Sequence, residues 1–480
     1  MENEQTFIQS GFLERETDVA LFQQIKKGRG RPRKAENNFY QVSMELRHRK
    51  RARLQNDCKL AEDEKWIGNV LTSNPVIVKH LMRFLTAKQL SRAVVVCSLW
   101  RECALKEKLR RFEIQQFGFT VHHDNGEELP PFGTSRPSDV GNHFYQVTEN
   151  LRAEPRVVFI FTTQKVVSKA VKYFEDFSST PAYFRATAES LKRTKRHVYS
   201  VGLCNHLSTL LPRTSEIFLC TSWGMICWNK GLGPIEIEDC DGFSTLFLPN
   251  MPDVQFTSFR LLQQDCATSL RDDYLSEISG LSQVHNIAAL VLYANEMPDG
   301  GSAPARLVDY TIRRNPGMAL GGALVCDFSV PVDGVEREVV NMTGLAIHGQ
   351  GVRAASVLLD PDCRGREKVR ARLAVVGDQF QLTPGRSVAL LFACSGRGVH
   401  FHLAQNVESS IFSELFPGVP VVGLFGNGEF GYDSLGGRGT PGRSRQWQHS
   451  YTSVFVLLNF EPTSGRISPE ESSVPSEGHH

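Results

Sequence analysis

The sequence has 480 residues and a formal net charge of +2, with 22% charged, 41% hydrophobic and 9% aromatic residues. This composition excludes a collagen-like, fully disordered or disulfide-stapled chain, and the length predicts about two or three domains. The eleven cysteines form no CxxC pair, which favours a reducing compartment. The start MENEQTFIQS lacks a signal-peptide pattern, and the longest apolar runs are strand-sized. We therefore expect a soluble intracellular protein that does not enter a membrane.

Residues 1–66 are predicted to be a basic, disordered extension. Between Lys26 and Arg53, eleven lysines and arginines stand against two glutamates, a net charge of +9, so the rest of the chain carries −7. Within this segment Arg29-Gly30-Arg31-Pro32 resembles an AT-hook, whose arginines follow the negative potential of a narrow minor groove. The alternatives are a nuclear-import signal and a solvated tail. The charge predicts at most weak contact with AT-rich DNA and a location in both cytoplasm and nucleus.

Residues 68–115 have the spacing of three short helices. Ser73 and Asn74 can cap a helix, and Pro75 suits its first turn. Apolar residues then recur every three or four positions as far as Trp100, and a basic helix is predicted from Lys106 to Phe112. So small a unit cannot bury all of this apolar surface by itself. We expect it to dock either on the rest of the chain or on a partner.

The same residues carry a resemblance. Asn74-Pro75-Val76-Ile77, Phe84-Leu85 and Val96-Cys97-Ser98-Leu99-Trp100-Arg101 resemble an F-box, although Asn74 stands where leucine is usual. The resemblance implies binding to a Skp adaptor and, through it, to cullin and RING subunits, which would make this chain the substrate receptor of a ubiquitin ligase. Trp100 is expected to be the interface hot spot. The expected adaptor-binding residues are Pro75, Ile77, Leu81, Phe84, Leu85, Leu90, Val94, Cys97 and Trp100.

The remaining chain predicts an α+β fold, in which the three-helix unit is followed by a two-lobed mixed α/β body. Residues 118–150 begin with a stretch rich in glycine, proline and polar residues and are predicted to be a linker. Strands then outnumber helices in expected lobes at 151–275 and 280–462, and a disordered tail follows at 463–480. A helix that ends at proline before a glycine-marked strand recurs near Pro212, Pro316 and Pro417, which suggests two related lobes.

Three strand ends of the C-terminal lobe carry polar residues. Backbone N–H groups and the guanidinium within 394–398 are expected to face one carboxylate or phosphate. The stretch 426–431 ends a second strand, and 449–452 opens a third. Because polar strand ends often converge on one pocket, the expected ligand or substrate pocket comprises Cys394, Gly396, Arg397, Gly398, Asn427, Gly428, Glu429, His449 and Tyr451.

These three motifs, Cys-x-Gly-Arg-Gly, Gly-Asn-Gly-Glu-Phe-Gly and His-Ser-Tyr-Thr, resemble the FIST domain, a sensory module proposed to bind small ligands such as amino acids. Behind an F-box, the resemblance implies that the FIST lobes recruit protein substrates for ubiquitination and degradation. We expect a non-catalytic receptor without metal or cofactor. Two alternatives stay open: a chromatin-associated protein led by the AT-hook-like arm, and a small-ligand sensor or cysteine-dependent enzyme centred on Cys394, Arg397 and Glu429.

Overall fold

A computed structural model describes residues 66–121, 134–135, 140–164, 166–167, 192–229, 233–238, 241–251, 253–266, 270–329, 340–435 and 446–461. The AT-hook-like motif, the rest of the basic extension and the expected C-terminal tail lie outside these ranges. The chain divides into two units, residues 1–78 and 79–480. Among the described helices, none is long and apolar enough to cross a membrane.

Helices occupy the block for which the sequence predicted them, but the boundaries differ. Residues 66–73 are also helical, and the chain leaves the helix at 94–97, so Trp100 and Lys106 lie in one helix instead of two. α3 (Pro75–Met82) follows Asn74, whose side-chain oxygen accepts hydrogen bonds from the N–H groups of Val76 (3.0 Å) and Ile77 (3.2 Å). α4 (Ala87–Ala93) starts with a reciprocal capping box between Thr86 and Gln89, and α5 covers Ser98–Arg110. Capping therefore fixes where α3 and α4 begin.

Both ends of the expected linker at 118–150 carry regular secondary structure. β1 (Gln115–Val121) pairs antiparallel with β7 (Asp241–Pro249), and α6 (Val140–Asn150) follows the two-residue β2 (Thr134–Ser135). The prediction failed here because β1 begins Gln-Gln-Phe-Gly and has no continuous apolar run. Its partner strand, more than 100 residues later in the sequence, supplies the missing stabilisation.

The body contains three six-stranded sheets, each of which mixes parallel and antiparallel pairs. Sheet 1 has the order β11-β4-β3-β7-β1-β2 and adds β3 (Pro155–Thr163), β4 (Glu216–Ser222) and β11 (Asp327–Ser329). Sheet 2 has the order β17-β16-β10-β9-β12-β8, made from β8 (Gln255–Leu262), β9 (Ile287–Ala294), β10 (Ala319–Leu324), β12 (Val340–His348), β16 (Glu429–Gly431) and β17 (Gln448–His449). Sheet 3 has the order β13-β18-β14-β15-β5-β6, made from β5 (Gly224–Asn229), β6 (Gly233–Ile237), β13 (Val352–Leu359), β14 (Ser387–Cys394), β15 (Val421–Gly426) and β18 (Ser453–Phe460). The fold is thus mixed α+β, as the sequence predicted.

The three sheets repeat one arrangement. Each has a parallel pair, β3–β4, β9–β10 or β14–β15, whose strands are connected through a helix: α9 (Lys192–Ser208), α12 (Ala303–Arg314) or α15 (Val407–Leu415). An antiparallel strand, β7, β12 or β18, lies on the other side of the first strand of each pair. The helix–proline pattern in the sequence precedes the second strand of all three pairs. It therefore marks three related units, where the sequence suggested two.

The units exchange edge strands in a cycle. β5 directly follows β4 of sheet 1 but pairs with β15 of sheet 3. β11 follows β10 of sheet 2 but pairs with β4 of sheet 1, and β16 follows β15 of sheet 3 but pairs with β10 of sheet 2. The predicted boundary between lobes at 275–280 does not describe these sheets, because strands from both sides of it share each of them.

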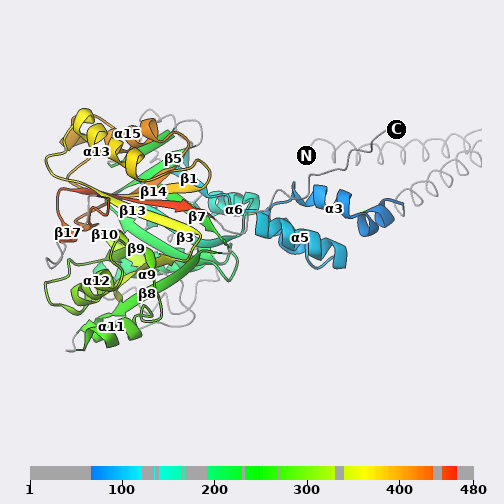
Figure 1. The fold of residues 1–480 in the computed structure, drawn as a ribbon, viewed down its shortest axis with the longest axis horizontal. Helices are drawn as coiled ribbons and strands as arrows, with labels where there is room; N and C mark the ends of the chain where they lie inside the picture. Colours follow the sequence, from blue (N-terminus) through cyan, green and yellow to red (C-terminus); the bar gives the residue numbers. More distant parts are fainter. Residues whose placement is uncertain are drawn as a thin grey trace, which may run out of the picture. The chain divides into compact units, whose positions relative to one another are not determined.

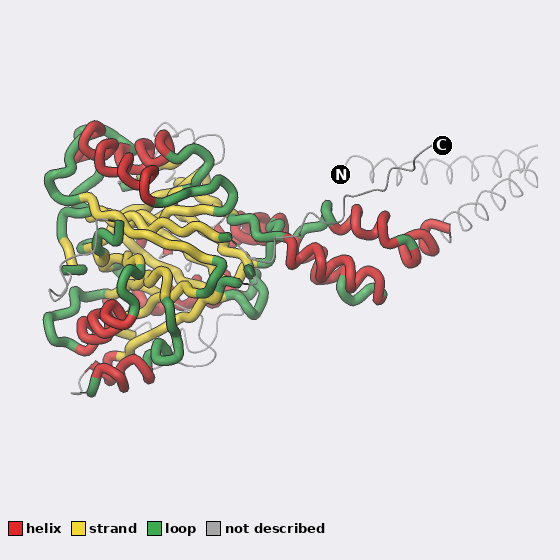
Figure 2. Tube along the Cα trace, in the orientation of Figure 1, coloured by secondary structure: helices red, strands yellow, loops and turns green. Residues whose placement is uncertain are grey.

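The sheets share one core, and helices form separate layers outside them (Figures 1 and 2). Alternate residues of β3, β9 and β14, such as Phe159, Val291 and Leu390, enter a single central cluster. The intervening residues pack against helices: α6 and α9 on sheet 1; α11 (Asp272–Ile278) and α12 on sheet 2; α13 (Arg366–Gln379) and α15 on sheet 3. Two short helices, α10 (Gln263–Cys266) and α14 (Val399–His402), follow β8 and β14. Two-sided burial explains the near-continuous apolar strands.

Candidate functional site

The first candidate site is the apolar surface of the predicted adaptor-binding helices. In the unit that ends at residue 78, Val76 of α3 is 73% exposed, and Pro75 and Ile77 are also exposed. Asn74 caps the helix here, so a leucine at that position would remove the cap. The departure from the F-box pattern at Asn74 therefore has a structural role of its own.

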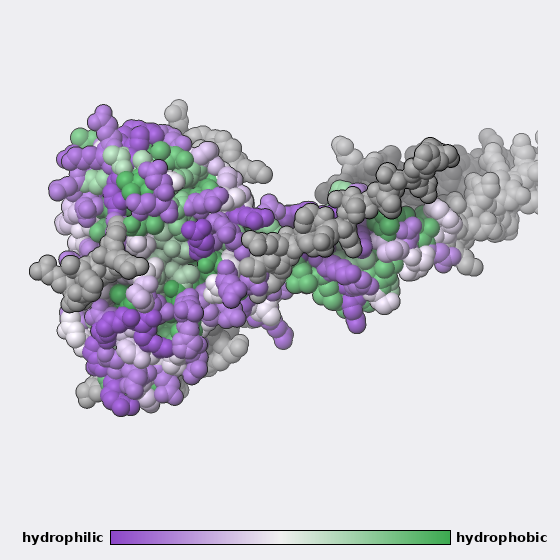
Figure 3. Space-filling view, in the orientation of Figure 1, coloured by the Kyte–Doolittle hydropathy of each residue, from purple (hydrophilic) through white to green (hydrophobic). Residues whose placement is uncertain are grey.

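In the second unit, Phe84, Val95 and Val96 are exposed, and Val95 is 77% exposed. Leu90 is fully buried within the chain, so it supports this surface from beneath and does not reach it. The remaining expected adaptor-binding residues, Leu81, Leu85, Val94, Cys97 and Trp100, are half-buried. The sequence analysis did not select Val95 or Val96 as contact residues, although Val96 belongs to the F-box-like motif. Figure 3 shows apolar side chains at the surface of the helical segment.

The charge of this surface is strongly positive. Between residues 79 and 110 seven lysines and arginines are exposed, whereas the exposed acidic residue is Glu102. On α5, Leu105 and Leu109 are exposed on the helix face opposite to the buried Cys103 and Ala104. A partner for these helices needs apolar pockets surrounded by acidic groups.

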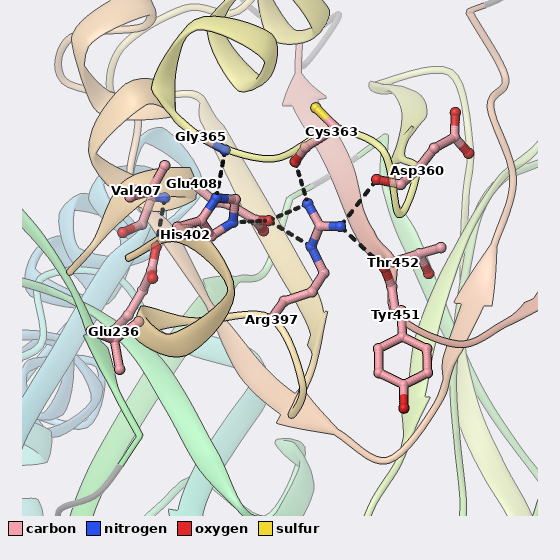
Figure 4. Close-up of polar contacts among 12 residues, drawn as sticks. Glu236, Asp360, Cys363, Gly365, Arg397, His402, Val407, Glu408, Tyr451 and Thr452 are labelled. Atoms are coloured by element: carbon pink, nitrogen blue, oxygen red, sulfur yellow. Dashed lines mark hydrogen bonds and ion pairs between the residues drawn. The ribbon is translucent and has the colours of Figure 1, made fainter. Parts of the chain in front are cut away.

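The second candidate site was expected around Arg397, but its guanidinium does not face an open pocket. The side chain is 1% exposed and all five of its N–H donors are used within the chain. Nε lies 2.7 Å from Oε1 of Glu408, and Nη2 also contacts Glu408 (2.7 Å) and donates to the carbonyl of Cys363 (3.0 Å). Nη1 donates to the carbonyls of Asp360 and Tyr451, each at 3.0 Å (Figure 4). Arg397 therefore ties three loops together and has no donor left for a ligand.

Glu408 is the centre of this polar cluster. His402 accepts a hydrogen bond at Nδ1 from the N–H of Gly365 (3.1 Å), so its Nε2 carries the proton and donates to Glu408 (2.9 Å) (Figure 4). Burial opposes ionisation of Glu408, yet Arg397 and His402 hold its pKa below the ordinary value. The carboxylate therefore remains charged inside the protein, compensated by Arg397.

Two glutamates attach the β5–β6 hairpin to this cluster: Glu236 lies in β6, and Glu238 directly follows it. Glu236 accepts from the N–H of Ser409 (2.8 Å), and its own N–H donates to Asn406 (2.8 Å). Glu238 accepts from the N–H of Val399 (2.8 Å). Burial, with the charge of Glu408 next, raises the pKa of Glu236 to about 7. These contacts join positions about 160–170 residues apart, so no local sequence signal marked them.

Gly398 and Gly396 serve close packing. A Cβ on Gly398 would lie 1.8 Å from the carboxylate of Glu238, and the residue has a φ of +28°. A Cβ on Gly396 would lie 3.1 Å from the exposed ring of Tyr451. The two glycines beside Arg397 are thus explained by their neighbours in this chain rather than by a bound anion.

Cys394 and Glu429 are brought together, as the expected pocket required. Burial, followed by the charge of Glu429, raises the pKa of the Cys394 thiol. Burial raises the pKa of Glu429 to about 7, while its carboxylate accepts from the N–H (3.2 Å) and hydroxyl (2.8 Å) of Thr452. A thiol whose pKa is raised carries little thiolate at neutral pH, which disfavours nucleophilic catalysis by Cys394.

The other expected pocket residues do not face one common pocket and have different surroundings. His449 Nε2 lies 3.0 Å from the carbonyl of Gly431, and burial lowers the pKa of His449. Asn427 is exposed and Gly428 is buried with a φ of +131°. Tyr451 is exposed, with a φ of +59° that a non-glycine residue rarely adopts. The described residues contain no group of three or more histidine, cysteine or acidic side chains that could hold a metal ion.

The similarity to known proteins extends over both the helical segment and the body. No protein-family model matches the chain. The solved structure of cyanuric acid hydrolase from A. caulinodans covers 73% of this chain and 99% of its own at 7% identity, with a TM-score of 0.29, which is too low to support a shared fold. F-box only protein 22 from Pongo abelii is 24% identical over 425 residues, covering 84% of this chain and 97% of the relative. The Homo sapiens protein of the same name is 24% identical over 407 residues, covering 81% of this chain and 94% of the relative. The chain is therefore similar to F-box only protein 22 over nearly the whole length of that protein.

Proposed function

We propose that this chain is the substrate receptor of a Skp-cullin-F-box ubiquitin ligase. Residues 68–115 act as the F-box that binds the Skp adaptor, and the body acts as a FIST-like module that recruits the protein substrate. The proposal is carried by the exposed apolar and basic residues of α4 and α5 and, in the unit that ends at residue 78, by the exposed apolar residues at the start of α3. The similarity to F-box only protein 22 supports the same function. The basic extension supports a location in both nucleus and cytoplasm.

Adaptor binding is tested by placing a charge on this surface. Val95→Asp puts a carboxylate on a side chain that is 77% exposed, so the free chain should keep its stability while co-purification of the full chain with a Skp adaptor is lost. Leu403→Asp is the matched control, because Leu403 is also 77% exposed but lies after α14 in the body. Equal adaptor recovery for both variants and the unaltered chain would overturn the proposal.

Substrate recruitment is assigned to exposed aromatic residues of the body. Trp223, between β4 and β5, and Tyr451, before β18, are both exposed, and aromatic side chains dominate binding energy at protein interfaces. Proteins that accumulate when the chain is removed from cells should fall again when the unaltered chain is restored. Restoring the Trp223→Ala/Tyr451→Ala variant should leave them high while adaptor binding persists. Full rescue by this variant would exclude these two residues from recruitment.

The geometry disfavours both forms of the second alternative, the small-ligand sensor and the cysteine-dependent enzyme. A small-ligand sensor that binds an anion through Arg397 would need a free guanidinium donor, and all five are used. A cysteine-dependent enzyme would need a depressed thiol pKa, whereas burial raises that of Cys394. The AT-hook-like motif lies outside the described residues and stays a prediction.

A further inference from the structure

Arg111 connects the end of α5 to two other segments of the same unit. It is 9% exposed, and all five of its N–H donors are used. Nε donates to Glu107 of α5 (2.8 Å). The two terminal nitrogens donate to four backbone carbonyls: Leu85 (2.6 Å), Arg152 (2.8 Å), Met82 (2.8 Å) and Arg83 (3.0 Å). One side chain therefore holds together the α3–α4 connection, the end of α5 and the connection between α6 and β3.

We call Arg111 and Glu107, together with segments 82–87 and 149–154, the joint. Further hydrogen bonds and ion pairs form at the joint around Arg111. The N–H of Ala87 donates to the carbonyl of Leu151 (2.7 Å), and Arg152 donates to the carbonyl of Arg83 (2.7 Å). Lys108 pairs with Glu154 (2.6 Å), and Lys88 pairs with Glu149. The helices are thus bonded to the body at several points, each of them polar.

The connection between α5 and the body is short. Four residues separate Arg110 from Gln115, the first residue of β1, and Ile114 among them is buried in the central core. A pocket of about 310 Å³ opens beside the joint, lined in part by Ala87, Thr148 and Leu151, so apolar packing on that side is incomplete. Buried apolar residues such as Met82 and Leu151 pack at the joint, and the hydrogen bonds and ion pairs centred on Arg111 add the directional contacts between α5 and the body.

We propose that Arg111 is a positioning residue that sets the orientation of the adaptor-binding helices α4 and α5 relative to the body. This inference rests on the proposed function, because the orientation matters when one end of the chain holds the ligase scaffold and the other holds the substrate. Fixing two reactants in one geometry raises the rate of transfer between them. A rigid joint therefore directs ubiquitin to a restricted set of lysines, and a loosened joint spreads it over more of them.

The direct test measures orientation in the full-length chain without any partner. Spin labels carried by non-canonical amino acids at Arg101 on α5 and at Gln405 in the body avoid the native cysteines, and both positions are exposed. Pulsed EPR should give one narrow distance distribution for the unaltered chain and a distribution about twofold wider for Arg111→Met. Arg111→Lys, which keeps the charge but not the five-donor fork, should be intermediate. Arg110→Met is the matched control, because Arg110 is exposed and also pairs with Glu107 but does not bond the other segments.

A milder variant covers the case in which Arg111→Met fails to fold. Ala87→Pro removes only the N–H that bonds Leu151, at the first position of α4, where proline is tolerated. Thr86 already has the extended backbone that precedes a proline, with φ −73° and ψ 167°. This variant should also widen the distribution while the melting temperature stays close to that of the unaltered chain. Narrow distributions in both variants would overturn the inference.

The functional consequence is read in a ligase assembled from the full chain, a Skp adaptor, cullin and a RING subunit. The unaltered chain should acquire ubiquitin on a restricted set of its own lysines, identified by mass spectrometry. Arg111→Met should acquire it on a larger set with unchanged adaptor affinity, a combination that simple loss of structure does not produce. An unchanged set would overturn the inference. If the unaltered chain acquires none, the proposed function fails, whereas the EPR measurement still decides whether Arg111 orients the helices.

Discussion

Arg397 and Glu408 form an ion pair inside the protein, with Nε and Oε1 2.7 Å apart and with both side chains removed from solvent. The pair also forms hydrogen bonds with His402 and with three carbonyls from two loops. The ion pair neutralises the buried charges of Arg397 and Glu408 at the point where α14, α15, the β5–β6 hairpin and the start of β18 meet. Breaking such a pair leaves a buried charge alone, which costs more than the pair contributes when intact.

Arg397→Met should therefore lower the free energy of unfolding by about 3–5 kcal/mol. Glu408 would then remain buried beside His402 without its arginine. Urea unfolding at neutral pH measures the loss. Arg366→Met is the control, because Arg366 forms an exposed pair with Glu414 and its loss should cost no more than about 1 kcal/mol. Similar losses for both variants would contradict the central role of Arg397.

Trp100→Ala should weaken binding to a Skp adaptor by about 2–4 kcal/mol, because a half-buried indole offers a large apolar area to a partner. Titration calorimetry with the full chain measures the change. Trp223→Ala removes another partly exposed indole, located in the body, and should leave adaptor affinity unchanged. Circular dichroism of Trp100→Ala separates a lost contact from a lost helix. Unchanged affinity with intact helices would remove Trp100 from the interface.

Glu429 should make the protein less stable as pH rises. Its pKa in the folded chain is about 7, against an ordinary value of 4.5, so the folded chain keeps a proton that the unfolded chain releases. Between these values the native state binds more protons, and its stability falls with increasing pH. Glu429→Gln should remove this dependence. The free energy of unfolding of Glu429→Gln relative to that of the unaltered chain should therefore rise by about 2–3 kcal/mol as the pH increases from 4.5 to 7.

Urea unfolding at several pH values measures that gain. Glu414→Gln is the control, because the pKa of the exposed Glu414 is lowered by Arg366 and Arg370, so its contribution is lost only as pH falls through the acid range. A constant difference in stability between Glu429→Gln and the unaltered chain over pH 4.5–7 would show that Glu429 titrates normally.

Asn74→Ala should destabilise the start of α3 by about 1 kcal/mol, since it removes the acceptor of two first-turn N–H groups. Hydrogen exchange at Val76 and Ile77 measures the effect. Thr72→Ala is the control, because the Thr72 hydroxyl only donates to carbonyls of the preceding turn. Equal exchange in both variants would mean that Pro75 alone determines where the helix begins.

The sequence predicted elements whose stabilisation is local or whose burial is two-sided. The run from Ile287 to Ala294 lies in β9, where every second residue enters the central core, and Asn74 caps α3 as its position suggested. β1 was missed because its stabilisation comes from β7, far along the chain. The number of repeated units was also misjudged, because strand exchange between sheets leaves no mark in the periodicity of any one strand.

The candidate site was predicted less well than the fold. Cys394 ends β14, and Glu429 begins β16 directly after β15. The two residues meet because β14 and β15 are parallel neighbours that end at the same edge. Arg397 has the residue type and glycine neighbours of an anion site, but its partner Glu408 lies eleven positions later on a helix, where spacing gives no indication of contact. Sequence alone identifies which groups carry charge. Only the folded chain shows which of them are already neutralised.

The cyclic exchange of edge strands has a consequence for biosynthesis. As the polypeptide leaves the ribosome, sheet 1 lacks its outer strand until Asp327–Ser329 is made, and the hairpin β5–β6 has no sheet to join until β15 is complete. The nascent N-terminal half must therefore wait with open strand edges, which are natural targets for chaperones. A premature stop codon anywhere before β16 would leave sheet 2 incomplete, and we expect chaperones and proteases to recognise the truncated chain.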